Sequence, residues 1–189
     1  MRHWYLVHHL DNRARALADR HYSRQNPGAS EFCPPGNKIV LIVPSDDFTF
    51  ARALWVSHRP DPKANLAKPR ADGFLYWNNP YFRNESNLRA SDLILEALAI
   101  TRYIWNDERP RDGFHSFVDP KHVQGVKVRG ETVYGFTYLK AGFTRWPELT
   151  KSRKLIRLVM PLAQLIEIQP LAPLIELQKQ MSLFDWTAA

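Results

Sequence analysis

Four residues in two short segments have side chains that could carry chemistry. His21 and Tyr22 lie in Asp-Arg-His-Tyr-Ser-Arg, and Ser116 and Asp119 lie in Phe-His-Ser-Phe-Val-Asp-Pro. A histidine and a carboxylate that converge can act as a general base, because the carboxylate fixes the imidazole tautomer. Alternatively, His21, Tyr22 and Asp119 together would suit ferrous or ferric iron better than structural zinc. A purely structural role for His21 stays open.

Positive charge is concentrated in one part of the chain. Residues 120–160 hold nine basic and two acidic residues, an excess that equals the net charge of +7 of all 189 residues. Aromatic residues are interspersed there, as on surfaces that bind phosphates and stack on bases. We expect a polyanionic partner, and charge alone leaves nucleic acid, an anionic cofactor and an acidic protein open. The candidate DNA contacts are Arg20 and Arg24, which flank His21-Tyr22, and Arg145, Lys151, Arg153 and Lys154.

The apolar pattern predicts the elements that position these residues. Asp11 is the expected N-cap of a helix through residues 13–21, and Ser91 that of a helix over residues 91–105. A short helix is expected over residues 137–140, closed by Gly142. Strands are expected over residues 38–43, 50–57, 73–78, 115–118 and 155–160, with a loop over 58–72 and an irregular turn over 79–90. This order predicts an α/β or α+β single domain around a mixed sheet.

The turn between the third strand and the long helix predicts an anion site. The free amides of a first helical turn converge on one point and attract negative charge. Arg83 and Arg89 add positive charge in this turn. Many helices begin after a strand without binding anything, so the turn alone leaves both interpretations open.

The order of elements, ending in Tyr138-Leu139-Lys140-Ala141-Gly142-Phe143, resembles the acetyl-CoA-dependent N-acyltransferase (GNAT) superfamily over residues 10–160. The resemblance implies a single domain whose central mixed, mostly antiparallel, twisted sheet is flanked by helices. It implies that Tyr138 faces the thioester sulfur of acetyl-CoA or a related acyl-CoA and acts there as an acid. It also implies that Ser116 lies on the acceptor side, where His21 and Asp119 would together act as the general base. The residues that it places around the cofactor are Arg83, Arg89, Ala90, Ser91, Asp92 and Lys140.

One departure from the GNAT pattern concerns the phosphate loop. The family's loop carries Gln/Arg-x-x-Gly-x-Gly/Ala, whereas the turn here, Arg-Asn-Glu-Ser-Asn-Leu-Arg-Ala-Ser, has no glycine. The backbone approaches a pyrophosphate less closely without glycine. Either Arg83 and Arg89 supply charge instead, or the donor is not an ordinary acyl-CoA.

Four segments together are similar to a divergent phage branch of that superfamily, the Mom-type DNA-modification proteins. They are Arg-His-Tyr-Ser, Phe-Arg-Asn-Glu before the Ser-Asp helix, Phe-Val-Asp-Pro, and Tyr-Leu-Lys-Ala-Gly-Phe. The resemblance implies transfer of a carbamoylmethyl (acetamido) group to N6 of adenine in double-stranded DNA, which protects phage DNA from restriction. The alternatives are a conventional N-acetyltransferase acting on a small amine or protein, and a non-catalytic accessory protein that binds DNA or the sliding clamp.

The last residues form a distinct segment. We expect a catalytic domain over residues 1–165 and an appendage over residues 166–189. Gln180, Met181, Ser182, Leu183 and Phe184 resemble the peptide with which bacterial replication proteins dock in the sliding clamp. A cytoplasmic location and no membrane partner are expected, because the sequence has no apolar run that spans a bilayer, no signal peptide and a single cysteine, Cys33. The sequence leaves the oligomeric state open.

Overall fold

The computed structural model of the chain describes residues 2–59, 73–106 and 110–174. The helices are α1 (Asn12–Asp19), α2 (Ala90–Ile104), α3 (Phe136–Lys140) and α4 (Leu162–Glu167). The strands are β1 (Tyr5–Val7), β2 (Asn37–Pro44), β3 (Ala51–Arg59), β4 (Trp77–Asn84), β5 (Phe114–Val118), β6 (Val126–Val128), β7 (Glu131–Val133), β8 (Thr144–Leu149) and β9 (Ile156–Met160).

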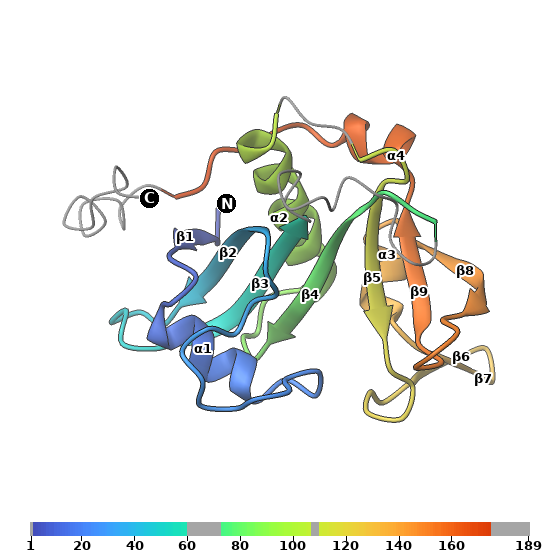
Figure 1. Cartoon of the computed structure of the whole chain (residues 1–189), viewed down its shortest axis with the longest axis horizontal. Coiled ribbons are helices and arrows are strands. Elements are labelled where there is room, and N and C mark those ends of the chain that lie inside the picture. Colours follow the sequence, from blue (N-terminus) through green and yellow to red (C-terminus); the bar gives the residue numbers. More distant parts are fainter. Residues whose placement is uncertain (1, 60–72, 107–109, 175–189) are drawn as a thin grey trace.

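Seven strands form one large sheet in the order β1-β2-β3-β4-β5-β9-β8, and β6 and β7 form a separate two-stranded sheet. Within the described residues β4 and β5 are the parallel pair, and the other neighbours are antiparallel. Figure 1 shows helices on both sides of the large sheet. The expectation of a mixed α/β domain with a mostly antiparallel sheet flanked by helices is therefore confirmed at that level.

The alternation of side chains along the strands produces a core on each face of the sheet. In β2, Leu41 joins the core that α2 covers, whereas Ile42 joins the core that α1 covers. Trp55 and Leu98 are fully buried on the α2 face, and Leu17 is fully buried on the α1 face. Because both faces are covered, functional groups gather at the ends of the strands, toward the lower end of Figure 1.

Several predicted elements are confirmed and others are wrong. The Asp11 carboxylate caps α1 by accepting bonds from the amides of Arg13 and Ala14, and the long helix, the first two strands and the short helix before Gly142 form as predicted. Ser91 is not the N-cap of α2: the cap is Arg89, and the Ser91 hydroxyl, which is buried, bonds to the neighbouring Asp92 carboxylate.

The third predicted strand is displaced along the chain. Residues 79–84, predicted as an irregular turn, continue β4. The strand pairs with β3 across a bulge between Val56 and His58, which lies opposite Asn79 and Pro80. Pro80 has no amide hydrogen to place in the ladder, and the bulge accommodates it. The proline therefore shifts the pairing without ending the strand.

The bulge lies where β4 and β5 separate. The two strands pair only from Trp77 to Asn79, opposite Phe114 to Ser116. Beyond that point β4 continues beside β3, and β5 continues beside β9. Figure 1 shows the two strands diverging toward the lower end of the molecule. The divergence opens the sheet at its centre.

The predicted boundary between domain and appendage, at residues 165 and 166, falls inside α4. Beyond α4, Leu171 donates a backbone hydrogen bond to Ala99, and Leu174 donates one to Trp4 and bridges to β1. The predicted clamp peptide, residues 180–184, lies outside the described residues.

Candidate functional site

Two cavities lie at the divergence of β4 and β5. The larger has a volume of about 540 Å³ and lies against the α1 face, where the loop of residues 22–35 meets β4. The smaller, of about 160 Å³, lies against Phe82, Val118 and α3. Both are lined by four of the same residues, Tyr22, Asn79, Pro80 and Phe117. The two cavities therefore meet along a shared wall in the opening between the strands.

Tyr138 and Asn79 form the buried polar pair of the site. The Tyr138 hydroxyl donates a 2.6 Å hydrogen bond to Asn79 Oδ1. The Asn79 Nδ2 group donates to the carbonyls of Val56 and Tyr81, at 2.9 and 2.7 Å, which are register partners on β3 and β4 next to the bulge. Burial raises the pKa of Tyr138, and a hydrogen bond with Ser116 offsets only part of that effect. Tyr138 is therefore a neutral phenol with its proton fixed in direction.

Sequence reasoning missed Asn79. Its position before a proline marks a break in a strand, but the sequence does not indicate that its side chain replaces ladder hydrogen bonds and faces Tyr138. Four of the predicted catalytic residues, His21, Tyr22, Ser116 and Tyr138, line the smaller cavity together, and the fifth, Asp119, lines the larger one.

His21 does not pair with Asp119, contrary to the prediction. Its Nδ1 atom lies 2.7 Å from the Ser23 hydroxyl, and its ring stacks on Tyr22 at a centroid distance of 4.5 Å. Burial, together with the positive charge of Arg83, lowers the pKa of His21 to about 4. His21 is therefore neutral near pH 7 and is a weak base.

Asp119 pairs with His122 instead. The Asp119 carboxylate accepts a 2.9 Å bond from the amide of Lys121 and lies 3.0 Å from His122 Nδ1, and these contacts lower the pKa of Asp119. The turn after β5, which begins at Asp119-Pro120, directs the carboxylate toward its own following residues, and that is why it does not reach His21. Sequence reasoning missed His122, although its spacing three residues after Asp119 is a local signal.

Tyr22 joins the end of α1 to the end of β5. Its hydroxyl donates to the Phe117 carbonyl at 3.2 Å and accepts from the Asp119 amide at 3.4 Å. Its ring lies between the rings of His21 and His122, and it is parallel to the latter within 4° at 5.8 Å. Burial raises the pKa of Tyr22, so it too is a neutral phenol. Tyr22 therefore connects the two sides of the opening.

Three predicted ligand-binding arginines are held by acidic groups of the protein. Arg20 pairs with Glu85 at 2.8 Å, and Arg83 contacts Glu85 and the Arg20 carbonyl. The Arg24 side chain, only 5% exposed, pairs with Asp19 at 2.8 Å and bonds to the carbonyls of Ala29 and Glu31. These residues brace the loop and the end of β4, so the predicted roles of Arg20 and Arg24 in DNA binding and of Arg83 in cofactor binding are not supported by their contacts.

The basic segment behaves differently. Eight of its cations are exposed, and none forms an ion pair with a described residue. They are Lys121, Lys127, Arg129, Lys140, Arg145, Lys151, Arg153 and Lys154. The ninth, Arg157, is buried over the rings of Phe74 and Phe117. Arg153 also lines the larger cavity, so uncompensated positive charge reaches the site itself.

Comparisons with protein-family models, curated proteins and solved structures give no match to this chain. The GNAT and Mom-type resemblance remains a sequence-based prediction. The function must therefore be inferred from the site. In the part of the chain that the structure describes, no helix is long and apolar enough to cross a membrane.

The turn before α2 has few free donors for a pyrophosphate. The Asn84 side chain accepts from the Ser86 amide at 3.0 Å and donates to the Leu88 carbonyl, and the Ser86 hydroxyl accepts from the Leu88 amide at 3.2 Å. The amides of Asp92 and Leu93 bond to the Arg89 carbonyl, and the Asp92 carboxylate adds negative charge in the first turn. Since Arg83 is also engaged, acyl-CoA recognition here would depend on the first amides of α2 and on the Arg89 side chain, which is 79% exposed.

The candidate iron ligands are directed to separate partners, His21 to Ser23 and Asp119 to His122. Over the described ranges, no cluster of three or more His, Cys, Asp or Glu side chains could hold a metal ion. Iron binding stays a prediction, and no step below depends on it.

Proposed function

We propose that this chain is a DNA-modifying transferase of GNAT-like fold that adds an acyl-derived group, of the carbamoylmethyl type, to N6 of adenine. The observation that supports this most is the position of Arg153 and its neighbouring unpaired cations beside the cavity that contains Tyr22 and Asp119. A surface of this charge favours a nucleic acid, and a cavity at its edge can receive one base of it.

The larger cavity suits a flipped-out base. Its volume of about 540 Å³ lies within the range of small-molecule sites. Aromatic rings line it at Tyr22, Tyr81 and Phe117, and exposed amide side chains line it at Gln25 and Asn26. Extruded bases are held by such stacking surfaces and by hydrogen bonds to their Watson–Crick edges. The amide of asparagine also has the geometry that pairs with adenine.

The exocyclic amine of adenine is a poor nucleophile, because its lone pair is delocalised into the ring. Positioning must therefore supply much of the rate enhancement. In the proposed reaction the bond from N6 to the transferred carbon forms as the bond from that carbon to the donor's leaving group breaks, and the leaving group departs with the bonding electrons. His122 is the proton acceptor: with Nδ1 held by Asp119, its Nε2 atom is free to take the amine proton. Tyr138, kept protonated by burial, donates its hydrogen bond to Asn79 Oδ1 and thereby orients that amide on the opposite side of the opening.

The donor in this proposal is an acyl-derived compound other than an ordinary acyl-CoA, because the turn before α2 has no glycine and several of its hydrogen-bond donors are engaged. A conventional acetyl-CoA-dependent acetyltransferase is accordingly the weaker candidate. Failure of acetyl-CoA to bind, or to raise the thermal stability of the protein, would agree with this choice.

A non-catalytic DNA-binding protein is the second candidate function. The hydrogen bonds within the turn before α2 favour it, because they leave fewer donors for a cofactor phosphate. Both candidates require the basic surface, and only the transferase requires the Asp119–His122 pair. Only the transferase would protect plasmid DNA in the host from restriction enzymes.

Mass spectrometry of nucleosides tests the transferase. Plasmid DNA would be isolated from cells that express the chain and that support the donor's synthesis, and digested to nucleosides. We expect a heavier deoxyadenosine derivative, lost in His122→Gln and reduced in Tyr138→Phe, with Tyr103→Phe as a control at an exposed tyrosine. An unmodified nucleoside profile with the wild-type chain would exclude the transferase in favour of the binding protein.

A further inference from the structure

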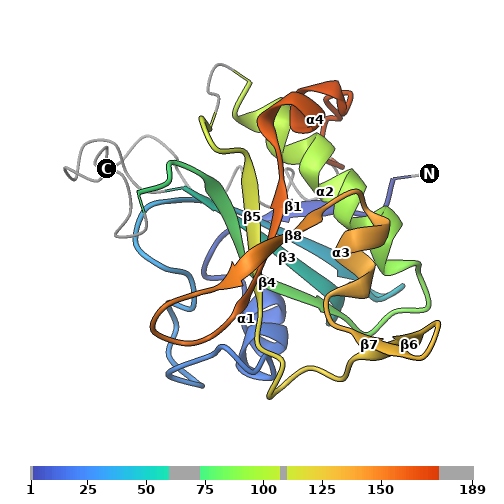
Figure 2. The ribbon, with the colours of Figure 1, turned by 90° about the vertical axis from the view of Figure 1, so that its right-hand side faces the viewer.

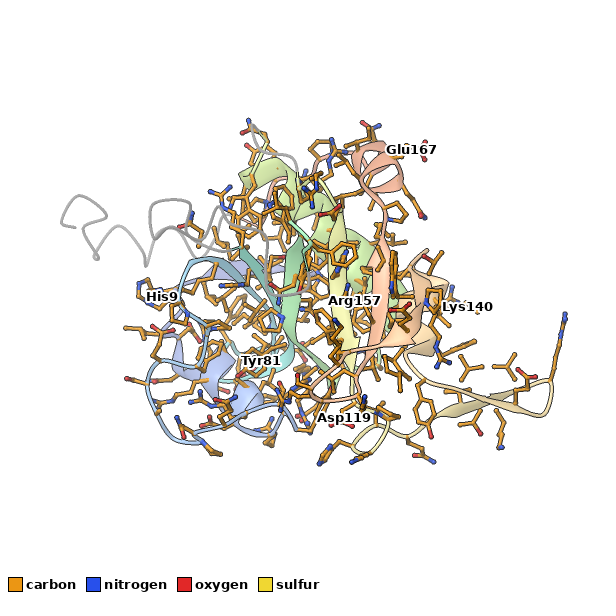
Figure 3. All side chains as sticks on the ribbon, turned by 45° about the vertical axis from the view of Figure 1, so that its right-hand side comes forward. His9, Tyr81, Asp119, Lys140, Arg157 and Glu167 are labelled. Carbon is orange, nitrogen blue, oxygen red and sulfur yellow. The ribbon has the colours of Figure 1, made fainter. Side chains whose placement is uncertain are left out.

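The β6–β7 hairpin stands apart from the rest of the fold. Its strands pair with each other, with Val126 opposite Val133 and Val128 opposite Glu131, and they belong to no other sheet. None of residues 126–133 is buried. The hairpin extends away from the body at the lower right of Figure 3. It contributes little to the core, so packing does not explain it.

The hairpin turn is tight and carries a cation at its tip. Arg129 and Gly130 both have positive φ angles, 50° and 88°, as in the two-residue turns that match the twist of a hairpin. Arginine rarely adopts this conformation, and glycine adopts it readily. Lys127 and Arg129 form no ion pair with any residue that the structure describes. The turn therefore presents two uncompensated cations on a preformed ribbon.

We propose that the β6–β7 hairpin inserts into the major groove of duplex DNA beside the modification site. That the partner of the hairpin is DNA rests on the proposed function. That the hairpin lies in the major groove follows from the widths of the ribbon and of the two grooves. Paired strands lie about 4.8 Å apart, and with side chains the ribbon fits the roughly 12 Å major groove but not the roughly 6 Å minor groove. Residues 125–129 reach about 15 Å, which exceeds the groove depth of about 8.5 Å.

The position of the hairpin relative to the site supports this assignment. In Figure 2 the hairpin lies to one side of the end of β5, and the turn between β8 and β9 lies to the other. That second turn carries Lys151, Arg153 and Lys154. Asp119 directly follows β5, so the site lies between the two basic projections. A duplex held at two points is fixed while a base between them is extruded.

Binding of three nucleic acids tests the hairpin. Affinity would be measured by fluorescence anisotropy for a DNA duplex, the same sequence as an RNA duplex, and the DNA single strand. RNA duplexes have a deep, narrow major groove that does not admit a ribbon, so phosphate contacts alone would affect DNA and RNA duplexes equally. We expect Lys127→Ala/Arg129→Ala to weaken DNA-duplex binding on the order of tenfold and to lower its salt slope by about two. RNA-duplex binding should change less than about twofold, because the hairpin stays outside its groove.

Two further variants separate charge from shape. Gly130→Val retains the charge but strains the turn at a φ of 88°, and we expect the same selective loss of DNA-duplex binding. Arg13→Ala/Arg52→Ala removes two cations that are ion-paired elsewhere and should leave all three affinities unchanged.

The outcomes distinguish this proposal from the proposed function. Equal losses on DNA and RNA duplexes, or wild-type binding by Gly130→Val, would overturn insertion of the hairpin and leave the transferase intact. A wild-type chain that binds no duplex DNA would overturn the hairpin proposal, and the nucleoside profile would then decide the transferase independently. Selective binding of RNA or of an acidic protein by the hairpin would also overturn it.

Discussion

Tyr138 donates its hydroxyl proton to Asn79 Oδ1 at 2.6 Å, and thereby connects α3 to the bulge of β4. Asn79 in turn satisfies the carbonyls of Val56 and Tyr81. One side-chain amide therefore both completes the interrupted ladder and orients the buried phenol of the site. The structural defect in β4 and the polar group of the cavity depend on the same residue.

Removal of the Tyr138 hydroxyl should cost stability as well as activity. In Tyr138→Phe the ring keeps its contacts with Trp55, Phe82 and Phe143, but Asn79 Oδ1 loses its donor in a buried position. The free energy of unfolding in urea should fall by about 1–2 kcal/mol. Tyr103→Phe, at a tyrosine that is 51% exposed, is the control and should change it little. Unchanged stability in Tyr138→Phe would mean that the hydrogen bond does not support the bulge.

Arg24 should matter for the loop that encloses the larger cavity. Arg24→Ala leaves Asp19 Oδ1 and two loop carbonyls without the arginine donor, while Asp19 Oδ2 keeps the Gly28 amide. We expect a loss of about 2–4 kcal/mol in urea unfolding. Arg20→Ala, which breaks a pair whose arginine is 49% exposed, should cost less than about 1 kcal/mol. Equal costs for the two variants would contradict the bracing role of Arg24.

His21 predicts a pH dependence of stability. Its folded pKa of about 4 lies below the ordinary value of 6.5, so the unfolded chain binds the extra proton first as the pH falls. Stability is therefore full above pH 6.5 and decreases as the pH falls toward 4. Urea unfolding between pH 7 and pH 4.5 should show a steeper decrease for the wild type than for His21→Gln. If the unfolding free energies of the wild type and of His21→Gln decrease in parallel with pH, protonation of His21 does not destabilise the folded state.

The cations of the β8–β9 turn should bind DNA phosphates. Lys151→Gln/Arg153→Gln/Lys154→Gln should lower the salt slope of DNA binding by about three, because each lost phosphate contact removes about one unit. The control, Arg13→Gln/Arg52→Gln/Arg111→Gln, changes the net charge equally at residues that are ion-paired to aspartates. Anisotropy titrations over a range of salt concentrations measure both. If the two triple variants weaken binding equally, only net charge matters and the turn is not a contact surface.

The main elements could be predicted because their signals are local. The Ile39–Val43 run and the Asp11 cap depend on neighbouring residues alone, and both are confirmed. The course of β4 could not be predicted, because proline normally marks the end of a central strand and only the tertiary pairing with β3 reveals the bulge. The Ser91 cap failed because the Ser-Asp pattern is equally compatible with a buried serine in the first turn.

The site could be predicted in part for the same reason. Tyr22, Ser116 and Tyr138, each predicted as a site residue, line one cavity in the structure. The partners of charged groups could not be read from the sequence. Glu85 lies 65 residues from Arg20 in the chain, and only the fold brings the two together as an ion pair. Asp119 pairs with His122, which is close in sequence, and not with His21, which is distant in sequence, because the geometry of the turn after β5 directs the carboxylate toward His122.

The short parallel pairing of β4 and β5 divides the large sheet into two mechanical units. One contains β1 to β4 and the other β5, β9 and β8, and they are joined through Trp77–Asn79 and Phe114–Ser116. The strands on either side of the joint pair more extensively, β3 with β4 and β5 with β9 at five positions each. Bending at the centre of the sheet therefore costs the fewest hydrogen bonds at the joint. A small rotation there would change the width of the opening at its far end, where Tyr22 spans it. The three paired positions of β4 and β5 thus form a hinge between the two units, and the hydrogen bonds of the Tyr22 hydroxyl connect the units at the open end.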